Sequence, residues 1–343
     1  MNTQRHARCA AITSALLLFG VVTLPSAAAT KDVTYGGICD ASAAVALDSK
    51  RFIVGDDNEN ILLIYDRTSP AKPAQKIVLS ELFPGEIKDG KEIDVEGAAV
   101  IGKKIFWIGS HGTNKLAESK PARQRLFAIS VEPGAGGKFV AARVGKIYAT
   151  LLADLEKDAR FKKYHIEKAK ATQPKGMRGL SIEGLAATAQ GGLLIGFRNP
   201  LVGGTEQNGR IVGGKALLVT LLNPLAVIAG KPAQFGDPIE LDLGGYGIRS
   251  IELRTKDEYL IVAGPYHEND ATPREESRLY LWSGKAPAPI AIKLDDLNVE
   301  AAFFYPDDAK QVQLLSDDGK NCRGGFRSRL ERIEGTAGSL PKR

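Results

Sequence analysis

A short phrase recurs along this 343-residue chain, and the repeat restricts the fold more than any other feature of the sequence. Two clear copies are DVEGAAVIGKKIFWIGSHG at residues 94–112 and SIEGLAATAQGGLLIGFRNP at residues 181–200. Three degenerate copies begin at Cys39, Ser250 and Asn298. Each copy holds an acidic residue, a short apolar run, a turn and a second apolar run that closes in a small residue. Repetition at this scale is typical of solenoids and propellers.

Further apolar runs follow each copy, and they predict strands. They are short, rich in β-branched and aromatic residues, and bounded by Gly, Pro, Asn and Asp. Four antiparallel strands repeated radially form a propeller blade, so we expect an all-β propeller of five four-stranded blades. The fifth copy ends after its third strand. We expect the N-terminal strand at residues 31–38 to pair in the last blade, because this closes the ring and removes an exposed sheet edge.

Residues 151–179 fall outside the repeat. Leu151, Leu152, Leu155 and Phe161 lie at helical spacing, which predicts a short helical insertion between the second and third copies. The segment is also long enough to conceal a degraded blade, so a propeller of six or seven blades remains an alternative.

The first 29 residues predict a secretory signal peptide, which leaves residues 30–343 as a single propeller domain. MNTQRHAR carries basic residues and no acid, an apolar core follows, and small residues precede the expected cleavage site. A membrane anchor is the alternative, but the apolar run is shorter than the roughly 20 residues of a spanning helix. No later segment could cross a bilayer. We therefore expect an exported protein, periplasmic or extracellular.

Two cysteines, Cys39 and Cys322, remain beyond the leader and stand near opposite ends of the chain. In an oxidising compartment such a pair favours a disulfide, which would also tie the first copy to the last blade. Two separate buried thiols are the alternative.

Propeller geometry indicates where chemistry would lie. The innermost strands begin, and the second strands end, on one face around the axis, so the acid of each copy should converge there. These acids are Asp40, Glu96, Glu183, Glu252 and Glu300. Polar residues after the second strands should join them: His111, Arg198, Asn199, His267 and Asp317.

Several carboxylates this close cannot be left uncompensated. Two like charges about 4 Å apart repel by roughly 4 kcal/mol at an effective dielectric constant of 20. A bound cation, an arginine or raised pKa values would compensate. Calcium suits carboxylate and amide ligands, so the five acids are candidate calcium ligands. We assign Glu96, Glu183 and His111 as candidate catalytic residues. The candidate ligand-binding residues are Arg198, Asn199, Arg249, His267 and Asp317. Alternatively, each acid is architectural and ties neighbouring blades together.

Composition and motifs exclude several classes of function. The net charge of +6 is mild, and no basic run is interleaved with aromatic residues, which argues against nucleic-acid binding. Nucleophile elbow, H-E-x-x-H, phosphate-binding loop and dinucleotide fingerprint motifs are absent. We expect a monomer that binds a small-molecule ligand or substrate.

Motifs along nearly the whole chain beyond the leader resemble one bacterial family, domain-of-unknown-function family 3616. They include GICDASAAVAL, WIGSHG, LLIGFRNPL, KALLVTLLNP and LDLGGYGIRSIE. The family is similar to the esterase-like phytase propellers, which implies an exported β-propeller with phosphoester hydrolase activity. The resemblance brings no catalytic residues with it. Two functions follow: a metal-assisted hydrolase of phosphoesters or esters, and a non-catalytic propeller that binds a ligand or protein.

Overall fold

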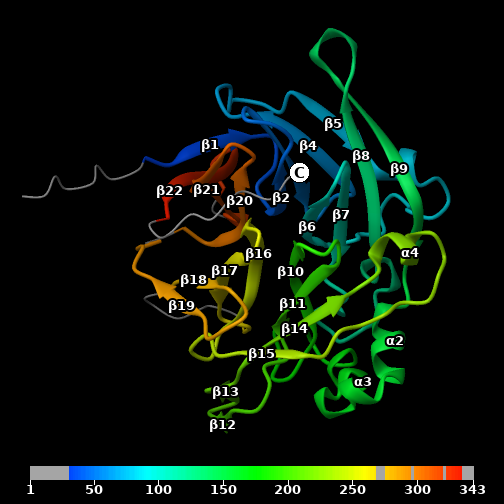
Figure 1. The fold of residues 1–343 in the computed structure, drawn as a ribbon, viewed down its shortest axis with the longest axis vertical. Helices are drawn as coiled ribbons and strands as arrows, with labels where there is room; N and C mark the ends of the chain where they lie inside the picture. Colours follow the sequence, from blue (N-terminus) through cyan, green and yellow to red (C-terminus); the bar gives the residue numbers. More distant parts are fainter. Residues whose placement is uncertain (1–30, 268–274, 295–296, 320–321, 334–343) are drawn as a thin grey trace, which may run out of the picture. The chain divides into compact units, whose positions relative to one another are not determined.

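The computed structural model describes residues 31–267, 275–294, 297–319 and 322–333, and these form a five-bladed β-propeller (Figure 1). The predicted signal peptide lies outside the described residues. In this part of the chain the structure contains five four-stranded antiparallel sheets, as the repeat predicted. The alternative counts of six or seven blades are not observed there.

Each blade runs outward from an inner strand. Blade 1 contains β2 (Ala41–Ala46), β3 (Arg51–Asp56), β4 (Ile61–Asp66) and β5 (Gln75–Val78). Blade 2 contains β6 (Val95–Ile101), β7 (Lys104–Gly109), β8 (Leu126–Pro133) and β9 (Phe139–Tyr148). Blade 3 contains β10 (Ser181–Ala187), β11 (Leu193–Asn199), β14 (Ala216–Leu221) and β15 (Ile239–Leu241). Blade 4 contains β16 (Gly247–Thr255), β17 (Glu258–Gly264), β18 (Arg278–Trp282) and β19 (Ala288–Ile290).

Blade 5 takes its outer strand from the other end of the chain. It contains β20 (Val299–Tyr305), β21 (Asp308–Ser316), β22 (Gly325–Arg332) and β1 (Val33–Gly36). β1 pairs antiparallel with β22, from Val33 opposite Ser328 to Gly36 opposite Gly325. The inner strands contact one another in the cyclic order β2, β6, β10, β16, β20 and back to β2. Their labels surround one axis in Figure 1.

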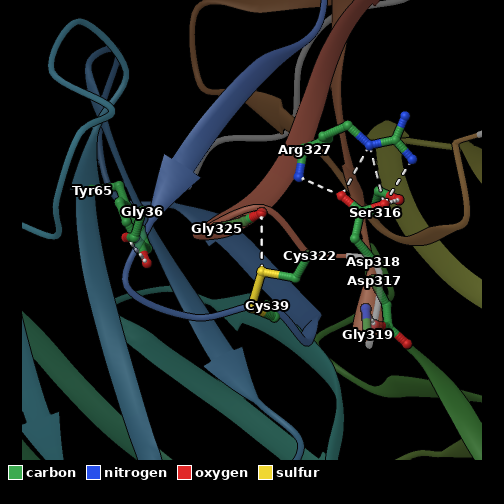
Figure 2. Close-up of a disulfide and its surroundings, with 10 residues drawn as sticks. All are labelled: Gly36, Cys39, Tyr65, Ser316, Asp317, Asp318, Gly319, Cys322, Gly325 and Arg327. Atoms are coloured by element: carbon green, nitrogen blue, oxygen red, sulfur yellow. Dashed lines mark hydrogen bonds and ion pairs between the residues drawn. A yellow bond between two sulfur atoms is a disulfide. The ribbon is translucent and has the colours of Figure 1, made fainter.

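The predicted disulfide is confirmed. Cys39 and Cys322 are bonded across 283 residues of sequence, with their Cα atoms 5.5 Å apart (Figure 2). Cys39 lies between β1 and the inner strand of blade 1, and Cys322 precedes the third strand of blade 5. The bond therefore ties blade 5 to blade 1 at the junction of the ring.

The apolar core is divided into layers between the blades. Five clusters of buried side chains each join one blade to its neighbour around the ring. Glycines of the repeat allow the inner strands to pack closely. A Cβ atom on Gly97 would lie 2.8 Å from the Cβ of Leu185 in the next blade, and one on Gly184 would lie 2.7 Å from Ile248. The glycine after the glutamate in these copies is therefore explained by packing.

The predicted insertion is helical. It contains α2 (Leu151–Lys157), the 3₁₀ turn Ala159–Tyr164 and α3 (Ile166–Ala169), and its apolar side chains pack with blades 2 and 3. The other short elements are α1 (Leu79–Leu82), α4 (Pro224–Ile228), two 3₁₀ turns at Pro121–Arg123 and Ala135–Gly137, and a hairpin of β12 (Thr205–Gln207) and β13 (Arg210–Val212). Among the described residues, no helix is both long and apolar enough to span a membrane.

Candidate axial site

A β-bulge occurs at the same place in all five inner strands. In β6, Val95 pairs with Gly109 and Gly97 with Ile108, so Glu96 is left without a partner on β7. The same interruption of the pairing occurs in each of the four remaining blades. The five bulged residues are Ser42, Glu96, Glu183, Arg249 and Glu300. Because a bulge redirects its side chain, these residues form one equivalent set around the axis.

This register changes two of the residues that the sequence comparison placed together. In blade 1 the equivalent of Glu96 is Ser42, and Asp40 lies two residues earlier, before β2. In blade 4 it is Arg249, whereas Glu252 lies further along β16, opposite Leu260. Glu252 is buried and is not among the residues that line the axial cavity. The comparison of the repeat copies matched acidic residue with acidic residue. In the structure, the position of the bulge determines which residues of the five blades are equivalent.

The bulged residues of blades 3 to 5 form a closed ion-pair network, which we call the arginine half. Arg249 donates from Nε to Glu300 Oε2 at 2.9 Å and also contacts Glu300 through Nη2. The same Nε lies 3.0 Å from Glu183 Oε2. Arg198 donates from Nη1 to Glu183 Oε1 at 2.8 Å and from Nε to the Pro265 carbonyl at 2.9 Å. All four side chains are less than a tenth exposed.

The arginines keep Glu183 ionised. Burial alone would raise the pKa of this carboxyl, but Arg198 and Arg249 outweigh it and hold the pKa below its usual value. Burial and the charge of Arg198 lower the pKa of Arg249 to about 10, so this guanidinium is still protonated at neutral pH. The arginine half is therefore compensated without any ligand.

Blades 1 and 2 contribute three acids that are not compensated in this way, and we call them the acid half. Ligand oxygens of Asp57, Asp94 and Glu96 all lie within 4.8 Å of one another. Asp94 accepts a hydrogen bond from the Ser110 hydroxyl and lies 2.9 Å from Arg123 Nη1. No other cation has an ion pair with these three carboxylates within the described residues.

The crowding of the acid half appears in its pKa values. Burial and neighbouring carboxylates raise the pKa of Asp57 to about 9, and that of Glu96 well above its usual value. Burial raises the pKa of Asp94 to about 7, even though Arg123 and Ser110 oppose it. Asp317, beside Asp40, has a pKa raised to about 6, chiefly by burial. Shared protons or a bound cation would relieve the repulsion.

Both halves face one cavity of about 400 Å³. Its wall includes the acid half, Ser42, Ser110, Asp317, Glu183, Glu300 and the basic residues Lys115, Arg123, Lys175 and Arg198. The acid half therefore offers carboxylate and hydroxyl oxygens to the cavity, and hard cations such as calcium prefer oxygen ligands. On this donor chemistry, Asp57, Asp94 and Glu96 fit a divalent cation.

The remaining predicted residues differ in their relation to the cavity. His111 is 1% exposed and does not line it; its Nδ1 lies 2.8 Å from the Gly109 carbonyl, and burial lowers its pKa to about 4. Asn199 is also buried and donates to the carbonyls of Pro174 and Gly176, each at 2.8 Å. It thus fixes the loop that carries Lys175 into the cavity wall. His267 contributes its carbonyl to Arg198 at 3.4 Å and pairs with Glu275.

Sequence reasoning did not single out Asp57, Asp94, Arg123 or Lys175. Asp57 follows β3 in a polar loop that was expected on this face, so its position carried a signal. Asp94 opens the second copy of the phrase and has a positive φ of 59°, which the sequence does not mark. Arg123 and Lys175 come from loops outside the repeat.

Comparison with known proteins identifies the family. The family model described as "Protein of unknown function (DUF3616)" matches residues 40–144 and 135–293, more than half of the chain. The chain belongs to the DUF3616 family. A search of curated proteins gives no match for this DUF3616 protein.

Solved structures with similarity to this DUF3616 protein include three enzymes. The PQQ-bound aldose sugar dehydrogenase of Streptomyces coelicolor is 13% identical, with a TM-score of 0.42 over 90% of this chain and 99% of that chain. Glutaminyl cyclase of Myxococcus xanthus is 11% identical, with a TM-score of 0.43 over 89% and 96%. A luciferin-regenerating enzyme is 10% identical, with a TM-score of 0.44 over 91% and 99%.

Proposed function

We propose that this DUF3616 protein is an exported hydrolase that cleaves a small phosphoester or carboxylic ester in the axial cavity with the help of a divalent cation. The observation that carries the proposal is the acid half: three carboxylates converge within 4.8 Å on the cavity wall, where arginine compensates only one of them directly. Calcium is our candidate cation because all the available ligands are oxygens.

The acids that line the cavity have two different roles in this proposal. Asp57, Asp94 and Glu96 would hold the cation, which would polarise the phosphoryl or carbonyl oxygen of the substrate. Asp317 lines the same cavity, and its pKa of about 6 suits a general base near neutral pH. It would accept a proton from the attacking water and return it to the leaving oxygen, so that water and ester give an acid and an alcohol.

The basic side chains favour an anionic substrate. Lys175 and Arg198 stand on the cavity wall, and Arg198 is held in place by Glu183 and the Pro265 carbonyl. A fixed guanidinium orients an oxyanion without losing much side-chain entropy. The sequence assigned Arg198 to ligand binding, and this role remains part of the proposal. His111 is no longer our candidate base, because it does not line the cavity.

Export is supported by the disulfide, since such bonds persist in oxidising compartments. Together with the leader expected in residues 1–29, it favours the periplasm or the extracellular space over the cytoplasm.

The proposal is tested by screening the purified protein against phosphoesters, esters and lactones, with added calcium and with chelator. We expect calcium-dependent turnover that falls by roughly 100-fold in Glu96→Gln and Asp57→Asn. Glu81→Gln, which removes an exposed acid on α1, is the matched control and should not change turnover. Full activity in folded Glu96→Gln and Asp57→Asn variants would rule out the axial site.

A non-catalytic binding propeller is the second candidate, and the arginine half favours it. Glu183 and Glu300 are occupied by arginines, as expected if these acids are architectural. The same screen separates the two functions, because binding of a phosphoester without turnover at any calcium concentration would favour this candidate.

A further inference from the structure

A second cavity, of about 800 Å³, lies where the chain passes from blade 1 to blade 2. Its walls come from residues 85–93 without Asp89, residues 119–125 without Gln124, Ile147 in β9 and Ala149 just after it. It shares only Arg123 with the residues that line the axial cavity. Its volume lies in the range of sites for small molecules.

The wall of this cavity is basic. Five basic and two acidic residues give it a net formal charge of +3: Lys88, Lys91, Lys120, Arg123, Arg125, Glu86 and Glu92. Both acids are already paired with arginines, Glu86 with Arg143 at 2.8 Å and Glu92 with Arg123 at 2.7 Å. Lys120 also lies 4.0 Å from Glu118. The positive charge of Lys88, Lys91 and Arg125 is therefore left to face the cavity.

Arg125 stands out among these residues. Its side chain is only partly exposed, yet no hydrogen bond or ion pair reaches its guanidinium from the described part of the chain. Burial lowers the pKa of Arg125, and the charge of Glu86 offsets this only in part. A guanidinium has five N–H donors, and leaving them unpaired and partly desolvated is unfavourable. An oxyanion in the cavity would satisfy them.

The loop that carries Lys88 and Lys91 is held in a fixed conformation. Asn60 donates to the carbonyls of Lys88 and Lys91 at 3.1 and 2.9 Å, and its Oδ1 accepts from the backbone N–H of Ile93. Ile87 and Ile93 are buried in the cluster between blades 1 and 2. The cavity is therefore formed before any ligand arrives, which lowers the entropic cost of binding.

We infer that this cavity is a binding site for a small organic phosphate. The phosphate group would accept hydrogen bonds from Arg125, whose guanidinium matches the geometry of phosphate oxygens. The positive charges of Lys88 and Lys91 would attract it. Pro121, Ile147 and Ala149 supply apolar wall for the organic part. The site is separate from the acid half and does not depend on the hydrolase proposal.

Calorimetric titration of the purified protein with phenylphosphonate, a phosphate analogue that cannot be hydrolysed, tests the inference. Inorganic phosphate is titrated in parallel to separate recognition of the anion from recognition of its organic part. In chelator, where the axial cavity lacks its proposed cation, we expect a single site that binds phenylphosphonate more tightly than phosphate and is weakened by added salt. Arg125→Gln should weaken binding about tenfold, and Lys91→Gln, on the exposed loop, about threefold.

Two variants serve as controls. Lys103→Gln removes an exposed lysine that lines neither cavity, with the same change in charge, and should bind normally. Glu96→Gln reports on the axial cavity and should also bind normally. Loss of binding in Glu96→Gln but not in Arg125→Gln or Lys91→Gln would place the anion in the axial cavity and overturn the inference. No binding at millimolar phenylphosphonate, or equal binding by all variants, would overturn it as well.

Discussion

The arginine half and the acid half lie around the same axis of the propeller but differ in how far their carboxylates are compensated. In the arginine half, Arg249 at the bulge of blade 4 lies between Glu183 and Glu300 of the neighbouring blades and pairs with both. In the acid half, the bulge of blade 1 carries the neutral Ser42, and Glu96 faces Asp57 and Asp94 instead. In the arginine half the chain's own arginines compensate both carboxylates, whereas in the acid half Arg123 pairs with only one of three.

The difference shows how a repeated architecture can produce an asymmetric site. All five inner strands have the same bulge, so the backbone places five equivalent side chains around the axis, and four of them line the axial cavity. Which of them can bind a ligand then depends on the residue type at each bulge. Arg249 in blade 4 pairs with two carboxylates. Ser42 in blade 1 supplies no charge, so Asp57 and Glu96 have no ion pair within the described residues.

The largest expected effect comes from breaking the arginine half. Arg249→Met leaves two buried carboxylates without their shared cation, so we expect the free energy of unfolding to fall by about 3–5 kcal/mol. Urea denaturation of the purified variant measures it. Arg278→Met, which removes an exposed arginine from the ring of Tyr246, is the control and should cost less than about 1 kcal/mol. A similarly small loss in Arg249→Met would show that the network is dispensable.

The disulfide lies where blade 5 of the arginine half meets blade 1 of the acid half. Replacing Cys39 and Cys322 with Ser should lower the free energy of unfolding by about 2–5 kcal/mol, because the closed loop is long. Calcium affinity, measured by calorimetry on the folded variant, should change less than about threefold because the three acids belong to blades 1 and 2. A large loss of affinity would mean that the acid half depends on this closure.

In the acid half, removing a charge should have the opposite effect on stability. Without calcium, Asp57→Asn and Glu96→Gln should each stabilise the protein by about 1 kcal/mol, since each removes repulsion. Both variants should lose calcium affinity by about 10-fold or more. Thermal unfolding with chelator and with calcium measures both effects, and Glu81→Gln provides the matched loss of one exposed acid. Destabilisation of both variants in chelator would contradict the account.

The smallest effect is on the pH dependence of stability. A carboxyl whose pKa is raised in the folded state binds its proton more tightly there, so its contribution is present at low pH and is lost as pH rises through the folded pKa. For Asp317 and Asp94 these values are about 6 and 7. From these two groups, stability in chelator should therefore fall by on the order of 1–2 kcal/mol between pH 6 and 8, and calcium should offset the loss. A flat profile in chelator would argue against crowding.

The sequence predicted the fold better than the site, and the reason is physical. Apolar runs separated by turn residues determine strands, so the five blades could be predicted. The Cys39–Cys322 bond could be predicted because only two cysteines remain beyond the leader. A bulge shifts the side-chain register without changing composition. The acids of the first and fourth copies therefore looked equivalent to Glu96, although Ser42 and Arg249 occupy that place. Asp94 could not be identified as a partner of Asp57, since that proximity depends on how the two blades pack.

The most direct test of the divided ring is a crystal structure of the protein grown with calcium, with anomalous diffraction collected at long wavelength. We expect one peak, bounded by the carboxylates of Asp57, Asp94 and Glu96, and none between Glu183 and Glu300, where Arg249 already supplies the positive charge. A calcium ion at Glu183 and Glu300, or no ion among the three acids at saturating calcium, would contradict the account.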